Sequence, residues 1–190
     1  MSKAKLIDKE FIRLAVTLFL ITAIVALLLG AVNALTKDKI AALKTETQHE
    51  AMQSVMPSAH EFTDITEDAL AIEGMGESVK TVYETEHGFV FGVTVKGFGG
   101  DIEMVVGVDD SGYTTGAVIT SMSETAGMGA NASEESFIGQ FTWKSGELEV
   151  IKSGNPSDNQ VFAIAGATIT SNAVTKGIND ALRSAQLLTR

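Results

Sequence analysis

The stretch Ala165-Gly166-Ala167-Thr168-Ile169-Thr170-Ser171 stands immediately before the clearest helical pattern in the chain. After it, apolar residues recur every three or four positions, which predicts a helix over residues 171–188 with Ser171 as its N-cap and one apolar face: Val174, Ile178, Leu182 and Ala185. Backbone N–H groups at a helix start lack partners and the helix dipole is positive there, so this turn is suited to an anion such as phosphate. A plain tight turn followed by a cap is the alternative interpretation.

The residues before this helix follow a strand pattern instead. Val, Ile, Phe, Tyr and Thr are enriched in four segments separated by short Gly- or Asp-containing breaks, which predicts strands joined by hairpins: Val79–Glu84, Phe89–Lys96, Ile102–Val108 and Tyr113–Ser121. We expect a short strand or a loop over 58–78, a short helix over Glu134–Phe141 and one more strand over Leu148–Ile151. The prediction is an α+β domain in which helices cover a mainly antiparallel sheet.

The N-terminal part contains an uncharged stretch of 23 residues, Leu14–Thr36, that is long enough to cross a bilayer. A cleaved signal peptide is the alternative, with Val32-Asn33-Ala34 as a weak cleavage site, but the length favours an uncleaved anchor. The following residues predict a helical stalk that Pro57 ends. The expected organisation is a cytoplasmic tail (1–13), a transmembrane helix (14–36), a stalk (37–57) and a folded domain (58–190).

Charge indicates both the orientation and the classes of partner. Four basic residues precede the uncharged stretch and three follow it closely, which favours a cytoplasmic N-terminus and a folded domain outside the cytoplasm, at the cell (inner) membrane. The formal net charge is -10, and residues 1–36 contribute +2 to it, so the remainder is strongly acidic. Nucleic acid would repel such a domain. Because the chain has no cysteine, it holds no disulfide, iron–sulfur cluster or thiolate zinc site of its own, and redox chemistry would need an organic cofactor.

No ordinary catalytic or metal-binding set is predicted. His49, His60 and His87 are scattered without metal-ligand spacing, and we expect them at the solvated surface. Glu134 and Glu135 are best explained as the first turn of a helix, and nothing resembles a Ser-His-Asp system.

Three glycine-bearing strings remain: Lys96-Gly97-Phe98-Gly99-Gly100-Asp101-Ile102, Ser123-Glu124-Thr125-Ala126-Gly127-Met128-Gly129 and Ala165–Ser171. Each alone is typical of a turn, although glycines at strand ends also let the backbone approach a flat ligand. In this order, behind one transmembrane helix, they resemble the FMN-binding domain of the G subunit of Rnf electron transport complexes. The related C subunit of the sodium-pumping NADH:quinone oxidoreductase is similar too. The resemblance covers essentially the whole chain.

The resemblance implies a set of cofactor-binding residues. The last Thr of the family's Ser/Thr-Gly-Ala-Thr motif carries FMN through a phosphoester, and that position is Thr168. The middle string matches the family's Glu-Thr-Pro-Gly-Leu-Gly loop, which implies ring contacts from Glu124, Thr125, Gly127, Met128 and Gly129. The first string matches its Gly-Tyr-Gly-Gly segment with Gly97, Phe98, Gly99 and Gly100. The phosphate would be surrounded by Gly166, Ala167, Thr170 and Ser171.

Four positions depart from the family pattern. Ala126 replaces Pro and Met128 replaces Leu in the middle string, while Phe162 stands where the family usually has Asp and Ala165 replaces the Ser or Thr of the attachment motif. We expect modification of Thr168 nonetheless, because Gly166, Ala167 and Thr168 itself are retained.

By resemblance, the chain would be an electron-carrier subunit of a ferredoxin:NAD oxidoreductase complex that moves Na⁺ or H⁺. Its partners would be the integral membrane, iron–sulfur and flavin subunits of that complex. An FAD-dependent flavin transferase would attach the cofactor, since no local His or Lys is suited to activate Thr168. The alternatives are the C subunit named above, a stand-alone extracytoplasmic flavin reductase and a non-redox sensory domain.

Overall fold

The first element of the computed structural model, which describes residues 2–189 and side chains from residue 9, is the long helix α1, Ser2–Val55. It runs without a break through the predicted span and stalk and ends shortly before Pro57. Among the described residues it is the one helix long and apolar enough to cross a membrane, and the side chains of residues 14–36 are almost all exposed. The chain divides into residues 1–46 and a compact unit of residues 47–190, so the last turns of α1 belong to the compact unit.

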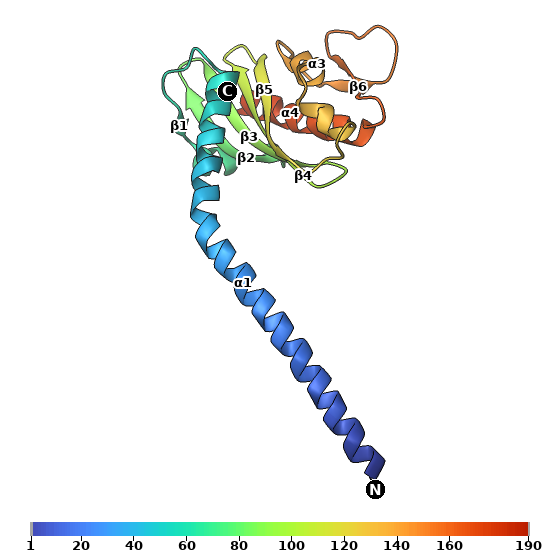
Figure 1. The fold of residues 1–190 in the computed structure, drawn as a ribbon. Helices are drawn as coiled ribbons and strands as arrows, with labels where there is room; N and C mark the ends of the chain where they lie inside the picture. Colours follow the sequence, from blue (N-terminus) through green and yellow to red (C-terminus); the bar gives the residue numbers. More distant parts are fainter. Residues whose placement is uncertain (1, 190) are drawn as a thin grey trace. The chain divides into compact units, whose positions relative to one another are not determined.

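A five-stranded antiparallel sheet forms the centre of the compact unit, in the order β1-β2-β3-β4-β5 (Figure 1). Its strands are β1 (Thr63–Asp64), β2 (Val79–Thr85), β3 (Gly88–Lys96), β4 (Asp101–Asp109) and β5 (Thr114–Met122). The four predicted strands are therefore confirmed to within one residue at each end. The pairing of β3 with β4 runs from Gly88 opposite Asp109 to Lys96 opposite Asp101, which makes the 97–100 turn the end of a regular hairpin.

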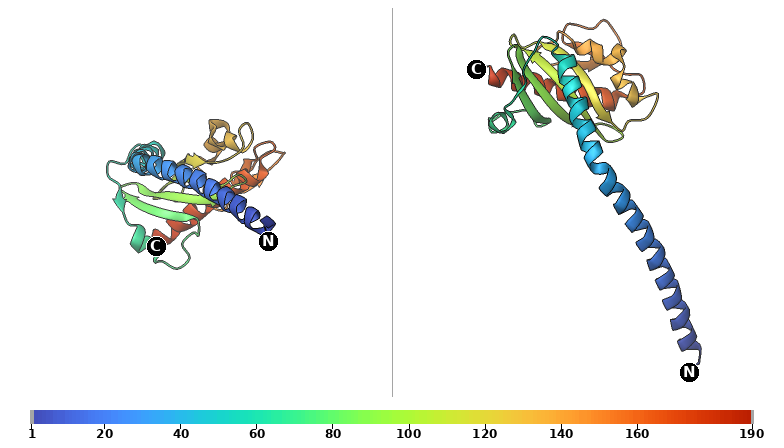
Figure 2. Two further views of the ribbon diagram at one scale, coloured as in Figure 1. Left: turned by 60° about the horizontal axis from the view of Figure 1, so that its bottom comes forward. Right: turned by 60° about the vertical axis from the view of Figure 1, so that its left-hand side comes forward.

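Side chains that alternate along the strands point to opposite faces of the sheet, and each face packs into its own apolar core. Helix α4, Thr168–Leu188, covers one face, where Val93, Met104 and Ile178 join the main core. The end of α1 covers the other face, where Val55 packs with Val105 (Figure 2). This alternation is the period of two that half-buried strands require. The fold is the expected α+β arrangement of an antiparallel sheet covered by helices.

Several short elements complete the fold. The 58–78 segment contains β1 and an unpredicted helix, α2 (Thr66–Leu70), whose first turn has the acidic residues Glu67 and Asp68. The predicted helix over 134–141 is split into α3 (Glu135–Ile138) and the 3₁₀ turn η2 (Gly139–Phe141), after a further turn, η1 (Gly129–Ser133). The predicted strand over 148–151 is β6 (Glu149–Ile151), and it pairs in parallel with an unpredicted strand, β7 (Gln160–Phe162).

The start of α4 corrects the prediction that Ser171 is an N-cap. The helix begins at Thr168, with Ala167 in the cap position, and Ser171 lies fully buried in the first turn. The reason is the preceding turn: Gly166 adopts a left-handed backbone with φ of 76°, and the Ser171 N–H already donates to the Ala167 carbonyl at 3.0 Å. The cap therefore lies four residues earlier than predicted, at Ala167 instead of Ser171.

Candidate functional site

The three glycine-bearing strings, far apart in the sequence, meet at the N-terminal end of α4. They come from the β3–β4 turn, from the segment after β5 and from the turn that leads into α4. Between them lies a pocket of about 300 Å³, lined by Phe98, Glu124, Thr125, Met128, Gly129, Gly166, Ala167, Thr168, Ile169 and Thr170. The predicted site residues that do not line it are Gly97, Gly99, Gly100, Gly127 and Ser171.

Three hydroxyl groups stand near the start of α4, and their surroundings differ. The Ser171 hydroxyl is buried; it donates to the Ala167 carbonyl at 2.9 Å and accepts the Ile164 N–H at 3.0 Å. The Thr170 side chain is 1% exposed, and its hydroxyl donates to Glu124 Oε2 at 3.1 Å. Thr168 is half-buried at the pocket wall, and the described part of the chain gives its hydroxyl no hydrogen-bond partner.

Glu124 joins all three strings through its carboxylate. Its Oε1 atom accepts the backbone N–H groups of Phe98, at 2.7 Å, and Gly99, at 3.2 Å, while Oε2 accepts the Thr170 hydroxyl. Hydrogen bonds to an ionised acceptor are stronger than those between neutral groups. This half-buried side chain therefore holds the three segments that form the pocket together.

The glycines of the site have different roles from one another. Gly127 and Gly166 have left-handed backbones, with φ of 74° and 76°, and shape the turns on either side of the pocket. Gly97 and Gly129 face Glu124 instead: a Cβ atom on Gly97 would collide with Oε1, and one on Gly129 would lie 2.5 Å from Oε2. The space that these two glycines leave is thus already filled by protein.

The rim of the pocket is apolar and exposed. Phe98, Met128 and Ile169 come from the three different strings and are 71%, 45% and 57% exposed. Exposed apolar side chains that gather around a pocket mark a binding surface more often than scattered ones do. Ile169 was not among the predicted site residues, because the predicted cap at Ser171 placed it before the helix. The available signal was an apolar residue between two threonines at a helix start.

Glu124 is the one charged side chain among the residues that line the pocket. An anion bound there would therefore have to rely on the free N–H groups and dipole at the start of α4 rather than on Lys or Arg. The two departures at and before the attachment motif lie outside the lining: Phe162 is in β7 and is 37% exposed, and Ala165 is exposed in the turn before α4.

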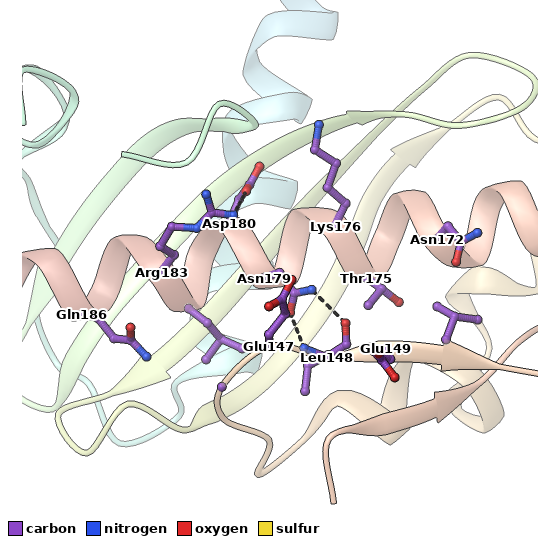
Figure 3. Close-up of a pocket in the computed structure, with 13 residues that line it drawn as sticks. Glu147, Leu148, Glu149, Asn172, Thr175, Lys176, Asn179, Asp180, Arg183 and Gln186 are labelled. Carbon is purple, nitrogen blue, oxygen red and sulfur yellow. Dashed lines mark hydrogen bonds and ion pairs between the residues drawn. The ribbon is translucent and has the colours of Figure 1, made fainter. Parts of the chain in front are cut away.

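A larger groove of about 940 Å³ runs between α4 and the segment around β6 (Figure 3). It shares no lining residue with the smaller pocket, and none of the predicted site residues lies in it. Lys176, Asn179 and Arg183 of α4 are among its lining residues; Asn179 points toward Leu148, whereas Lys176 extends away from the β6 segment. Its lining is mostly polar, without the convergent apolar rim of the smaller pocket.

Comparisons with known proteins agree on one family. Residues 1–55 match the family model described as the RnfG N-terminal region, and residues 97–183 match that of the FMN-binding domain. The chain is 34% identical over 197 residues to the G subunit of the Na⁺-translocating ferredoxin:NAD⁺ oxidoreductase complex of Acetobacterium woodii, which covers 96% of this chain and 95% of that protein. It is 32% identical to the G subunit of the proton-translocating ferredoxin:NAD⁺ oxidoreductase complex of Clostridium ljungdahlii, over 86% of this chain and 85% of that one.

A third relative comes from Methanosarcina acetivorans. The G subunit of its ion-translocating oxidoreductase complex is 34% identical over 92% of this chain and 94% of its own. Among solved structures, the C subunit of the Na⁺-translocating NADH-quinone reductase of Parabacteroides distasonis is similar, with a TM-score of 0.53 and 21% identity, covering 69% of this chain and 78% of that one. At that identity the structural likeness is evidence of a shared fold.

Proposed function

Because the chain belongs to the family of G subunits of Rnf-type ion-translocating oxidoreductase complexes, we propose that it is a membrane-anchored electron carrier whose FMN is ester-linked to Thr168. The match of residues 97–183 to the FMN-binding domain supports the cofactor. The name of each relative places it in a multi-subunit oxidoreductase complex, which supports the same assembly for this chain.

The single observation that carries the assignment to Thr168 is the state of the three hydroxyls. Ser171 and Thr170 are buried and already hydrogen-bonded, whereas the Thr168 hydroxyl lies at the pocket wall with no partner among the described residues. A hydroxyl that donates to a carbonyl and accepts an N–H has little freedom to react. Thr168 is therefore the oxygen that a phosphate could reach.

The residues around the pocket also fit a flavin phosphate. The N–H groups of the first turn of α4 would donate hydrogen bonds to the phosphoester oxygens. The apolar side chains of Phe98, Met128 and Ile169 would pack against the flavin ring. When bound, FMN supplies the electron-transfer chemistry, and the protein holds and tunes it. A covalent link keeps the cofactor in place even where the surrounding free flavin is too dilute to maintain binding by mass action.

The flavin transferase would supply the base that activates Thr168, since no His, Lys or Asp lines the pocket and the Glu124 carboxylate already accepts hydrogen bonds from Phe98, Gly99 and Thr170. With FAD as donor, the Thr168 oxygen bonds to the phosphorus of the FMN half, the pyrophosphate bond breaks and AMP leaves. The hydroxyl proton passes to the base of the flavin transferase. No group is oxidised or reduced in this step.

The membrane side and the coupled ion belong to the same proposal. The distribution of basic residues around the apolar stretch supports a folded domain outside the cytoplasm. A single helix cannot form an ion path, so Na⁺ or H⁺ would move through other subunits. The relatives include complexes named for each ion.

The test of the covalent site is retention of flavin after denaturation. Full-length protein is co-expressed with a flavin transferase, denatured and separated from small molecules, and the flavin fluorescence of the polypeptide is measured. We expect fluorescence for the wild type and for Thr168→Ser, which keeps a hydroxyl, and none for Thr168→Ala. Fluorescence that survives in Thr168→Ala, or that leaves with the small molecules, would contradict the proposal.

A further inference from the structure

We propose that Glu124 is the positioning residue of this site: its carboxylate fixes the 97–100 turn and the first turn of α4 relative to each other, and its charge lowers the potential of the flavin. The inference rests on the proposed function for the cofactor, but its geometric part stands on the structure of the flavin-free chain.

The Glu124 carboxylate accepts three hydrogen bonds from two other segments of the site. Glu124 Oε1 accepts two consecutive backbone N–H groups, from Phe98 and Gly99, and Oε2 accepts the Thr170 hydroxyl. One side chain thus connects the β3–β4 turn, its own loop after β5 and the helix that carries Thr168. Phe98, on the rim of the pocket, has its backbone N–H held by the shortest of these bonds, at 2.7 Å.

The space around the Glu124 carboxylate is bordered by two glycines. The glycines at 97 and 129 stand where a side chain would collide with Glu124, and a Cβ on Gly129 would also lie 2.8 Å from Thr170 Oγ1. A side chain at position 97 or 129 would therefore have to displace the carboxylate from its present position. Within the middle loop, the Thr125 carbonyl accepts the N–H groups of both Met128, at 3.2 Å, and Ala130, at 3.1 Å.

The negative charge of Glu124 has no ion-pair partner among the described residues. Among the described residues Glu124 has no Lys, Arg or His within ion-pair distance, so no cation neutralises it. A fixed negative charge beside a phosphate-binding helix start is unfavourable for binding an anion, so a role as a simple phosphate ligand is excluded. The same charge opposes the addition of an electron to a nearby ring, which lowers its midpoint potential.

Glu124 also determines what the Thr170 hydroxyl can bind. Its hydroxyl has one proton, and that proton is given to Glu124 Oε2. It is therefore not available to donate to a phosphate on Thr168. Glu124 leaves the phosphate to the backbone N–H groups of the first turn and keeps the neighbouring hydroxyl out of the reaction.

The experiment compares Glu124→Gln and Glu124→Ala with the wild type, in the full chain. The amide of Gln keeps an oxygen acceptor for the Phe98 and Gly99 N–H groups but removes the charge, whereas Ala removes both. Glu86 offers a matched control, since its Oε1 accepts the His60 N–H at 2.7 Å, and neither residue lines the pocket. The control variant is Glu86→Ala.

The first readout uses flavin-free protein, prepared without the transferase. Hydrogen exchange of the Phe98 and Gly99 amides should be faster by about tenfold or more in Glu124→Ala, the factor expected for loss of a hydrogen bond to a charged acceptor. It should rise by less in Glu124→Gln, whose neutral amide oxygen is a weaker acceptor than a carboxylate, and stay close to the wild type in Glu86→Ala. Unchanged exchange in Glu124→Ala would overturn the positioning role, whatever the outcome at Thr168.

The second readout uses flavin-loaded protein. We expect Glu124→Gln to be flavinylated like the wild type but to have a higher midpoint potential in a spectroelectrochemical titration, and Glu124→Ala to be flavinylated several-fold less. A midpoint potential unchanged in Glu124→Gln would overturn the electrostatic part. Because failure of the covalent proposal appears already as loss of flavin from the denatured wild type, the two failures are distinguishable.

Discussion

At the scale of single residues, chemistry at the α4 start depends on what each hydroxyl already binds. Thr168, Thr170 and Ser171 have the same functional group within four positions, yet burial and hydrogen bonding leave only Thr168 at the pocket wall without a described partner. The hydrogen bond from Thr170 to Glu124 leads to a prediction for Thr170→Val, a near-isosteric change. We expect flavin still to be attached at Thr168, while the hydrogen-bonded connection between α4 and the 97–100 turn through Glu124 is weakened. Intact mass after co-expression with the transferase measures attachment.

Tyr83 gives a prediction about pH. Burial raises the pKa of its phenol above the ordinary value of 10.0, and the Asp64 carboxylate adds to this rise. The stabilisation by the neutral phenol is therefore complete below the unfolded pKa and is lost as the pH rises through the folded pKa. Urea unfolding in detergent should show the wild type losing stability relative to Tyr83→Phe as the pH rises above about 10, the ordinary pKa of a tyrosine. Parallel pH profiles of the two proteins would contradict this.

At the scale of elements, side-chain amides bond to the backbone on each side of the two-stranded sheet β6–β7, at Leu148 just before β6 and at Phe162 in β7. Asn179, on α4, accepts the Leu148 N–H at 2.8 Å and donates to the Leu148 carbonyl at 2.9 Å, as Figure 3 shows. Gln140 accepts the Phe162 N–H at 2.7 Å on the β7 side. Such amides replace the strand neighbour that an edge otherwise lacks.

Removal of the Asn179 amide should therefore loosen this small sheet. Asn179→Ala leaves the Leu148 backbone groups unpaired beside α4, and we expect a loss of about 1–3 kcal/mol in the free energy of unfolding. Asn172→Ala, an exposed asparagine on the same helix, is the control and should change it by no more than about 0.5 kcal/mol. Urea unfolding followed by near-ultraviolet circular dichroism measures both; equal losses would show that the amide pairing is not the cause.

These elements also explain which parts of the structure the sequence could predict. The strands β2–β5 follow a local alternation with clear turn residues, so composition and period were enough. Strand β7 has three residues and exists through its pairing with β6, across a loop that local pattern does not report. Ser171 has the local chemistry of a cap, but the left-handed Gly166 and the Ala167 carbonyl decide that the helix begins earlier. The role of Glu124 depends on contacts over 26 and 46 positions, which no local pattern contains.

At the scale of the whole molecule, the chain combines an apolar helix with an acidic compact unit, and the side of the membrane decides how the site can be matured and used. Basic residues on both sides of the apolar stretch differ by one, four before and three after, so the orientation rests mainly on the short N-terminal tail. We predict that a single cysteine at Asn155, in an exposed loop, is labelled by a membrane-impermeant thiol reagent on intact cells.

A cysteine at Ser2 should stay unlabelled in intact cells and become reactive once the membrane is permeabilised. The chain has no cysteine of its own, so each variant reports one position without background from the protein. The reverse pattern, with position 2 labelled and position 155 protected, would place the compact unit in the cytoplasm. Attachment of FMN to Thr168 would then have to occur on that side, where free flavin can also reach the pocket, and the retention argument for a covalent link would lose its force.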